Sequence, residues 1–206
     1  MRDFRLYVIL DVDIAGPGGD IVEIARKTIS AGADILQLRA KSCSDRRILK
    51  IGRAIKNLVR KSKVLFVLND RADLARIIDA DGLHLGREDL PVKDARNILD
   101  NNKIIGLSTH SVEEAKEAER QKADYIAIGP IFPTATKPQS IALTPGIITK
   151  IKDKVKIPFV AVGGINLDNL DQVKAGGAQR VAVCRAIITA KDVFAVTKEF
   201  RQRLYR

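Results

Sequence analysis

Two carboxylates in the first half of the sequence stand where a metal that prefers oxygen ligands could bind. Asp70 comes shortly after the apolar run 64–68, and Asp89 comes shortly after the next apolar run, 82–85. Mg²⁺ usually binds one or two carboxylates together with phosphate oxygens of a substrate. The structural alternative is that both acids serve turns or caps, and Asp89, just before Pro91, could cap the following helix. The two carboxylates alone leave both interpretations open.

Cations near these acids indicate that the ligand is anionic. Arg39 and Lys41 follow the apolar run 34–38, and Lys137 lies in the long polar loop 132–143. Together with Mg²⁺, these three side chains could neutralise a pyrophosphate. The alternative is a set of salt bridges at the rim of the fold. A charge at the end of a strand, as at Arg39, favours the ligand, because buried charges need a partner.

A pair of glycines predicts a second place for an anion. Gly163 and Gly164 follow the apolar run 159–162 and are expected to open the next helix. Backbone N–H groups at a helix N-terminus have no partner within the helix, so they form a ready phosphate site. A structural turn is the alternative, and the following Ile165-Asn166 pair favours the phosphate.

The elements that must position these residues alternate between short apolar runs and helical patterns. Strands are predicted at 6–10, 34–38, 64–68, 82–85, 103–107, 125–128, 159–162 and 180–184, and helices at 21–30, 46–63, 72–78, 92–99, 112–121, 145–152, 167–175 and 192–204. Eight strand–helix pairs predict an α/β fold, a single parallel (β/α)8 TIM barrel forming one domain over residues 1–206. An open doubly wound sheet is the competitor, but the stretch 16–19 does not match its usual GxGxxG loop.

Such a barrel gathers its functional residues at the carboxyl ends of the strands. In strand order, the residues expected there are Gln37, Arg39, Lys41, Asn69, Asp70, Arg71, His84, Gly86, Asp89, Ser108, Thr109, His110, Gly129, Thr134, Thr136, Lys137, Gly163, Gly164 and Arg185. They predict two anionic subsites, one for a diphosphate with a metal and one for a monophosphate on backbone amides. The sequence indicates no Ser–His–Asp triad and no activated cysteine.

The composition limits the classes of partner. The net charge is +11, and much of it lies in the predicted helix 46–63, whose apolar residues recur at helical spacing. A solvated amphipathic face explains this run. The alternative is a nucleic-acid surface, but no binding motif and no interleaved aromatic residue supports it. No nucleic-acid partner is therefore expected, and the positive charge suits small anionic substrates.

Cysteines and hydropathy indicate the compartment. Cys43 and Cys184 form neither a CxxC pair nor a metal-ligand spacing, so a reducing environment is expected. Residues 1–10 lack the apolar region of a signal peptide, and no run approaches the roughly 18 apolar residues of a membrane span. A cytoplasmic protein without a membrane partner is expected.

Several long motifs resemble the thiamine phosphate synthase family. In chain order they are QLRAK (37–41), LFVLNDRADLA (65–75), ADGLHLGREDLP (80–91), GLSTHS (106–111), ADYIAIGPIFPTATK (123–137) and IPFVAVGGI (157–165). The resemblance covers essentially the whole chain. It implies a transferase of thiamine biosynthesis, in which the nitrogen of a thiazole phosphate displaces pyrophosphate from the methylene of a pyrimidine, through a carbocation-like pyrimidine.

The resemblance also implies roles for individual residues. The pyrophosphate of the pyrimidine would be contacted by Gln37, Arg39, Lys41, Asn69, Ser108 and Lys137, and Mg²⁺ would be held by Asp70 and Asp89. The thiazole phosphate would be cradled by Thr134, Thr136, Gly164 and the backbone of Cys184-Arg185. Arg39, Ser108 and Lys137 are the expected catalytic residues, because charge develops on the leaving pyrophosphate.

The chain departs from the family pattern at three positions. Ala40 replaces a glutamate, Arg87 a glutamine, and Arg185 the usual serine after the eighth strand. Arg185 could turn inward to bind the thiazole phosphate, or outward to pair with an acid on a neighbouring helix. None of the three departures removes a proposed metal ligand.

Two other functions remain compatible with a phosphate-binding barrel. A thiazole tautomerase would bind the thiazole phosphate without pyrophosphate or Mg²⁺, and His110 could act as its acid–base group. A non-catalytic phosphate sensor or RNA-binding barrel would show no turnover and salt-sensitive binding through residues 46–63. The set of residues expected at the metal and pyrophosphate argues against the first.

Overall fold

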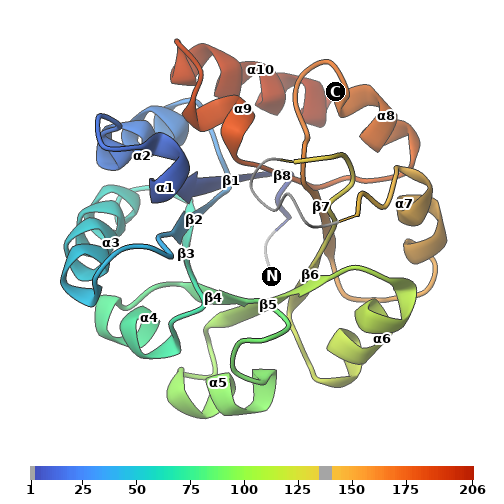
Figure 1. Ribbon diagram of the computed structural model, residues 1–206, viewed down its shortest axis with the longest axis horizontal. Coiled ribbons are helices and arrows are strands. Elements are labelled where there is room, and N and C mark those ends of the chain that lie inside the picture. Colours follow the sequence, from blue (N-terminus) through green and yellow to red (C-terminus); the bar gives the residue numbers. More distant parts are fainter. Residues whose placement is uncertain (1–2, 135–140) are drawn as a thin grey trace.

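The computed structural model describes residues 3–134 and 141–206, which form a closed barrel of parallel strands ringed by helices (Figure 1). The strands are β1 (Leu6–Asp11), β2 (Ile35–Arg39), β3 (Leu65–Asn69), β4 (Gly82–Leu85), β5 (Ile104–Thr109), β6 (Tyr125–Ile128), β7 (Phe159–Val162) and β8 (Val181–Val183). Each strand pairs in parallel with its sequence neighbours, and β8 closes the ring on β1. The predicted single (β/α)8 TIM barrel is confirmed.

The helices surround the barrel, and all except the last two, which follow the last strand, lie between successive strands. They are α1 (Val12–Ala15), α2 (Ile21–Ser30), α3 (Asp45–Val59), α4 (Ala72–Ile78), α5 (Val92–Ile98), α6 (Val112–Arg120), α7 (Gly146–Ile151), α8 (Leu170–Ala175), α9 (Arg185–Ile188) and α10 (Val193–Tyr205). The short helices α1 and α9 were not predicted. Four-residue segments are too short for a periodic apolar pattern to reveal them.

Alternation along the strands divides the core into two layers. In β1, Leu6, Val8 and Leu10 pack between the sheet and the helices. Tyr7 instead belongs to a smaller cluster inside the barrel, formed by Phe4, Tyr7, Ile35, Val67, Tyr125, Val160 and Ala182. Successive side chains of a strand point to opposite faces, so residues two apart share the barrel interior. Inward-facing residues that come later in each strand lie nearer the carboxyl end of the barrel.

Three aspartates before strands secure the amino end of the barrel. Asp34 accepts hydrogen bonds from the backbone N–H groups of Arg5 and Leu6, at 2.9 and 2.8 Å. Asp81 accepts the N–H of Phe66 at 2.8 Å, and Asp124 accepts that of Ile105 at 2.7 Å. Each acid joins a loop to the start of the preceding strand, and these hydrogen bonds stabilise the amino end of the barrel.

The same three aspartates anchor cations from the surrounding helices. Arg201 of α10 lies 3.1 Å from Asp34, and Arg96 of α5 lies 2.6 Å from Asp124. Lys56 of α3 lies 2.7 Å from Asp81. The pairing gives one cation of the basic segment 46–63 a structural role. The other basic residues of α3, Arg46, Arg47, Lys50 and Arg53, are exposed, as expected for a solvated face.

Within the described residues, no helix is long and apolar enough to cross a membrane.

Gly106 on β5 makes room for the ring of Tyr125 inside the barrel. A Cβ atom at Gly106 would lie 2.0 Å from Cζ of Tyr125, which is fully buried on the adjacent strand. We expect Gly106→Ala to lower the free energy of unfolding by about 1–3 kcal/mol, because the ring must leave its position. Urea unfolding measures this change.

Gly18→Ala is the matched control for Gly106→Ala. Nothing lies within 4 Å of a Cβ atom at Gly18. We expect the control to change the free energy of unfolding by less than about 0.5 kcal/mol. Equal stability of the two variants would contradict the steric role of Gly106.

Candidate active site

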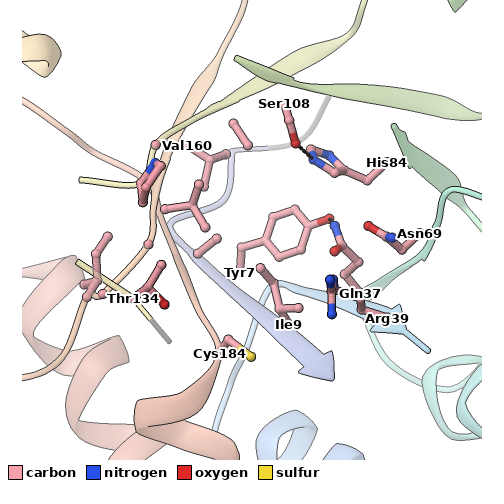
Figure 2. A pocket seen from close by; sticks show the side chains of 18 of the residues that line it. Tyr7, Ile9, Gln37, Arg39, Asn69, His84, Ser108, Thr134, Val160 and Cys184 are labelled. Carbon is pink, nitrogen blue, oxygen red and sulfur yellow. Dashed lines mark hydrogen bonds between the residues drawn. The ribbon is translucent and has the colours of Figure 1, made fainter. Parts of the chain in front are cut away.

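A pocket of about 480 Å³ opens at the carboxyl ends of the strands. The predicted site residues that line it are Gln37, Arg39, Lys41, Asn69, Asp70, Asp89, Ser108, Thr134, Gly164, Cys184 and Arg185. Figure 2 shows several of them, with Gln37, Arg39 and Asn69 on one side and Thr134 on the other. Thr136 and Lys137 lie outside the described residues. Residues distant in sequence thus meet around one cavity, as barrel geometry predicts.

Asp70 and Asp89 form an acid pair at the mouth of this pocket. Burial and the neighbouring Asp89 carboxylate raise the pKa of Asp70, while Lys41, with its Nζ 3.1 Å from Asp70 Oδ2, opposes the rise. Asp70 also has a φ of 62°, a left-handed conformation that is uncommon outside glycine. Unusual backbone conformations are concentrated at functional sites, and Asp70 combines one with a side-chain contact to a second carboxylate, Asp89.

Asp89 closes a turn and does not cap the next helix. Its Oδ2 accepts the backbone N–H of Gly86 at 2.6 Å. The N-cap of α5 is Pro91, which makes no side-chain cap hydrogen bond. The capping interpretation of Asp89 is therefore wrong. Asp89 stabilises a turn, and the same carboxylate also contacts Asp70.

The donor set of the acid pair fits a hard divalent cation. Two adjacent carboxylates repel one another unless a proton or a cation lies between them, and the raised pKa of Asp70 reflects that repulsion together with burial. No group of three or more potential metal ligands occurs within residues 3–134 and 141–206. Two carboxylates suit Mg²⁺, which keeps several waters and commonly shares substrate phosphate oxygens.

Asp11, which was not among the predicted site residues, holds Arg39 in place. The Arg39 Nη1 lies 2.5 Å from Asp11 Oδ2, and Asp11 is fully buried at the end of β1. The other oxygen of Asp11 accepts the N–H groups of Asp13 and Ile14, at 3.0 and 3.1 Å, and thereby caps α1. An aspartate at a strand end followed by a helix start was the available sequence signal.

A continuous row of hydrogen bonds crosses the floor of the pocket. Gln37 Nε2 donates to Tyr7 Oη at 2.7 Å, and Tyr7 Oη lies 2.9 Å from Tyr125 Oη. His84 bonds Tyr125 Oη through Nδ1 and Ser108 Oγ through Nε2, each at 3.0 Å, and Figure 2 shows the latter bond. Burial raises the pKa of both tyrosines above the usual range, so both phenols stay protonated. Tyr7 and Tyr125 were not predicted as site residues.

Gly163 and Gly164 do not open a helix, which corrects the prediction for this segment. The next helix, α8, begins only at Leu170. Both glycines have positive φ values, 97° and 65°. A Cβ atom at Gly163 would lie 2.4 Å from the Cβ atom of Pro130, and one at Gly164 would lie 2.7 Å from that of Phe132. The glycines therefore allow the loops after β6 and β7 to pack closely beside the pocket.

Cys184 and Arg185 complete the pocket wall after β8. Burial, together with the charge of Asp11, raises the pKa of the Cys184 thiol to about 12, so it is not an activated nucleophile. Arg185 is exposed and borders the pocket. None of the ion pairs among the described residues includes Arg185, so the outward alternative, a pair with an acid on a neighbouring helix, is not observed there.

His110 lies at the pocket rim but is engaged by Glu114. The carboxylate of Glu114 accepts the backbone N–H of His110 at 2.8 Å and lies 3.0 Å from its Nδ1. Burial raises the pKa of Glu114, but these contacts with His110 outweigh it and lower the pKa overall. A charged carboxylate thus orients the imidazole towards the start of α6.

Comparisons with known proteins identify relatives over almost the whole chain. Residues 6–187 match the family described as thiamine monophosphate synthase. A thiamine-phosphate synthase of Shouchella clausii is 43% identical over 199 residues, covering 96% of this chain and 95% of that protein. Another, from Pyrococcus furiosus, is 41% identical and covers 96% of this chain and 93% of that protein.

Solved structures agree with the sequence relatives. A thiamine phosphate pyrophosphorylase from Pyrococcus furiosus superposes with a TM-score of 0.88 at 39% identity, covering 98% of this chain and 96% of that one. An orotidine 5'-phosphate decarboxylase from Pyrococcus horikoshii, at 16% identity and a TM-score of 0.70, shares the fold alone. The chain belongs to the thiamine monophosphate synthase family.

Proposed function

We propose that this barrel joins 4-amino-2-methyl-5-(diphosphooxymethyl)pyrimidine to 4-methyl-5-(2-phosphooxyethyl)thiazole, forming thiamine phosphate and releasing pyrophosphate. The observation that carries the proposal is the acid pair Asp70 and Asp89 beside Arg39 and Lys41 in one pocket. Acids that hold a divalent cation, next to two positive side chains, form a site for a diphosphate. Residues 1–206 would act as a single domain.

The leaving pyrophosphate is the centre of the proposed mechanism. Mg²⁺, held by Asp70 and Asp89, would supply positive charge for the phosphate oxygens when bound. Arg39 and Lys41 would donate charge-assisted hydrogen bonds, which strengthen as negative charge develops on the leaving group. Ser108 and Asn69 would complete the contacts. The role of Lys137 on the same pyrophosphate rests on the family resemblance alone.

The attacking thiazole would require little chemistry from the protein. Its nitrogen carries a free lone pair, so no general base is needed, and the buried, protonated Cys184 is not a competing nucleophile. Thr134, Gly164 and the Cys184-Arg185 segment border the side of the pocket where its phosphate would lie. Thr136 is assigned to this phosphate by the resemblance alone. The barrel would mainly hold the two substrates in line.

Release of pyrophosphate tests the proposal directly. We expect turnover only when the pyrimidine diphosphate, the thiazole phosphate and Mg²⁺ are all present. Isomerisation of the thiazole without the pyrimidine would instead support a tautomerase. Absence of turnover with salt-sensitive binding through residues 46–63 would support a binding protein.

Asp89→Ala should raise the Mg²⁺ concentration for half-maximal rate by about tenfold or more, because one of two carboxylate ligands is lost. Glu88→Ala is the matched control, since the side chain of this neighbouring acid is 93% exposed. Far-ultraviolet circular dichroism should show both variants folded. Normal turnover of Asp89→Ala at low Mg²⁺ would contradict the metal assignment.

Arg185→Ser should raise the KM for the thiazole phosphate by roughly tenfold, because one charge-assisted bond of ~1.5 kcal/mol is lost. The expectation rests on an exposed guanidinium that borders the pocket. The KM for the pyrimidine diphosphate should barely change and serves as the internal control. A thiazole KM within about twofold of the parent value would place Arg185 outside the phosphate subsite.

A further inference from the structure

Tyr125 is the central member of the hydrogen-bonded row on the pocket floor, yet it does not border the pocket. It is fully buried, whereas Tyr7, Gln37, His84 and Ser108 all line the cavity. A substrate in the pocket would therefore meet the neighbours of Tyr125 and not Tyr125 itself. Any influence of this phenol on chemistry must pass through the groups to which it is hydrogen-bonded.

Gln37 determines the hydrogen-bond direction at its own end of the row. An amide nitrogen has only protons to give, so Tyr7 Oη accepts from Gln37 Nε2 at 2.7 Å. Tyr7 Oη has one hydrogen of its own, and when it donates this hydrogen to Tyr125 Oη, the Tyr125 hydroxyl is left to donate to Nδ1 of His84. If the row ran in the opposite direction, Tyr7 Oη would accept hydrogen bonds from both Gln37 and Tyr125. Its own hydroxyl hydrogen would then have no acceptor within the row.

An accepting Nδ1 fixes the tautomer of His84. A neutral imidazole carries one proton, which must then be on Nε2, 3.0 Å from Ser108 Oγ. Ser108 Oγ then accepts a hydrogen bond from Nε2–H, and its own hydroxyl hydrogen is left to donate elsewhere. Ser108 is less buried than the rest of the row and lines the cavity, so that hydrogen is available to a ligand.

We propose that Tyr125 is a positioning residue that holds neutral His84 in the Nε2–H tautomer and thereby makes Ser108 a hydrogen-bond donor to the diphosphate. This inference rests on the proposed function, in which Ser108 contacts the pyrophosphate. Phosphate oxygens only accept hydrogen bonds, so a hydroxyl that donates attracts them and one that presents a lone pair repels them. The hydrogen-bond direction in the row therefore favours an anionic ligand at Ser108.

Packing holds the Tyr125 ring in this role before any substrate binds. The ring lies over Gly106 of β5, where a Cβ atom would come within 2.0 Å. The rings of Phe4, Tyr7 and His84 surround it, with centroid distances of 6.5, 6.0 and 5.6 Å. Because the ring cannot move far, the Tyr125 hydroxyl is held between Tyr7 and His84 before a substrate binds, which lowers the reorganisation required during reaction.

The histidine tautomer can be measured without substrate or turnover. The chain has only two histidines, His84 and His110. Nitrogen NMR of the protein labelled with ¹⁵N-histidine, compared with His110→Asn for assignment, reports which ring nitrogen of His84 is protonated. At neutral pH we expect a proton on Nε2 and none on Nδ1. A proton on Nδ1, or on both nitrogens, would overturn the proposal whether or not the protein has the proposed activity.

Tyr125→Phe removes one oxygen and tests the link to Ser108. We expect His84 to lose its single tautomer, and kcat to fall about tenfold while the KM for the thiazole phosphate is unchanged. Tyr205→Phe is the matched control, because that phenol bonds Asp34, which secures the opposite end of the barrel. It should leave both the tautomer and the rate as in the parent.

A double variant separates positioning from a merely structural role. If Tyr125 acts through Ser108, Tyr125→Phe should cause no further loss of kcat in a Ser108→Ala background. Independent losses in the double variant would overturn the proposal. If Tyr125→Phe does not fold, Tyr7→Phe interrupts the row one bond earlier. An unchanged His84 tautomer in that variant would show that the row does not set it.

Discussion

Closure of the barrel determines where polar chemistry can occur in this molecule. Eight strands paired in a ring leave no free edge, and every second side chain enters the interior. A polar group buried there without a hydrogen bond costs free energy, so the interior accepts such groups only as connected sets. The row from Gln37 to Ser108 is one such set. It lies between the apolar cluster around Phe4 and the charged pocket mouth, and it joins the two.

The charged side chains of the pocket are positioned by their ion-pair partners more than by the high net charge of the chain. Lys41 is paired with Asp70, and Arg39 is paired with the fully buried Asp11. A cation between Asp70 and Asp89 would reduce the hold of Asp70 on Lys41 and free that ammonium for an anion. The exposed cations of α3 lie on the outer ring and are screened by solvent over roughly 10 Å. Local pairs, and not the overall charge of +11, therefore control the site.

The sequence could predict the barrel because strand and helix periodicities alternate through the whole chain. It also predicted many of the described polar residues that lie together, since parallel strands bring their carboxyl ends to one side. Arg71, predicted to lie among them, instead pairs with Asp45 and Asp73 outside the pocket. The sequence could not predict Tyr125 as part of the hydrogen-bonded row beneath the pocket, because a tyrosine in a buried strand resembles any core aromatic until its partners are known. The prediction for Gly163-Gly164 failed for a related reason. Glycine shows that the backbone is unusual there, but not whether a helix or the neighbouring Pro130 requires it.

Asp11 illustrates how a buried acid could support the proposed binding of an anion by Arg39. Its two oxygens are both engaged, one by Arg39 and the other by two N–H groups of α1, so the carboxylate presents no free oxygen to an incoming phosphate. A guanidinium has five N–H donors, and the contact with Asp11 involves only one of its nitrogens. The remaining donors stay available on a side chain that borders the pocket. Since the orientation of Arg39 is fixed by a residue on the adjacent strand, less side-chain entropy is lost when it binds a ligand.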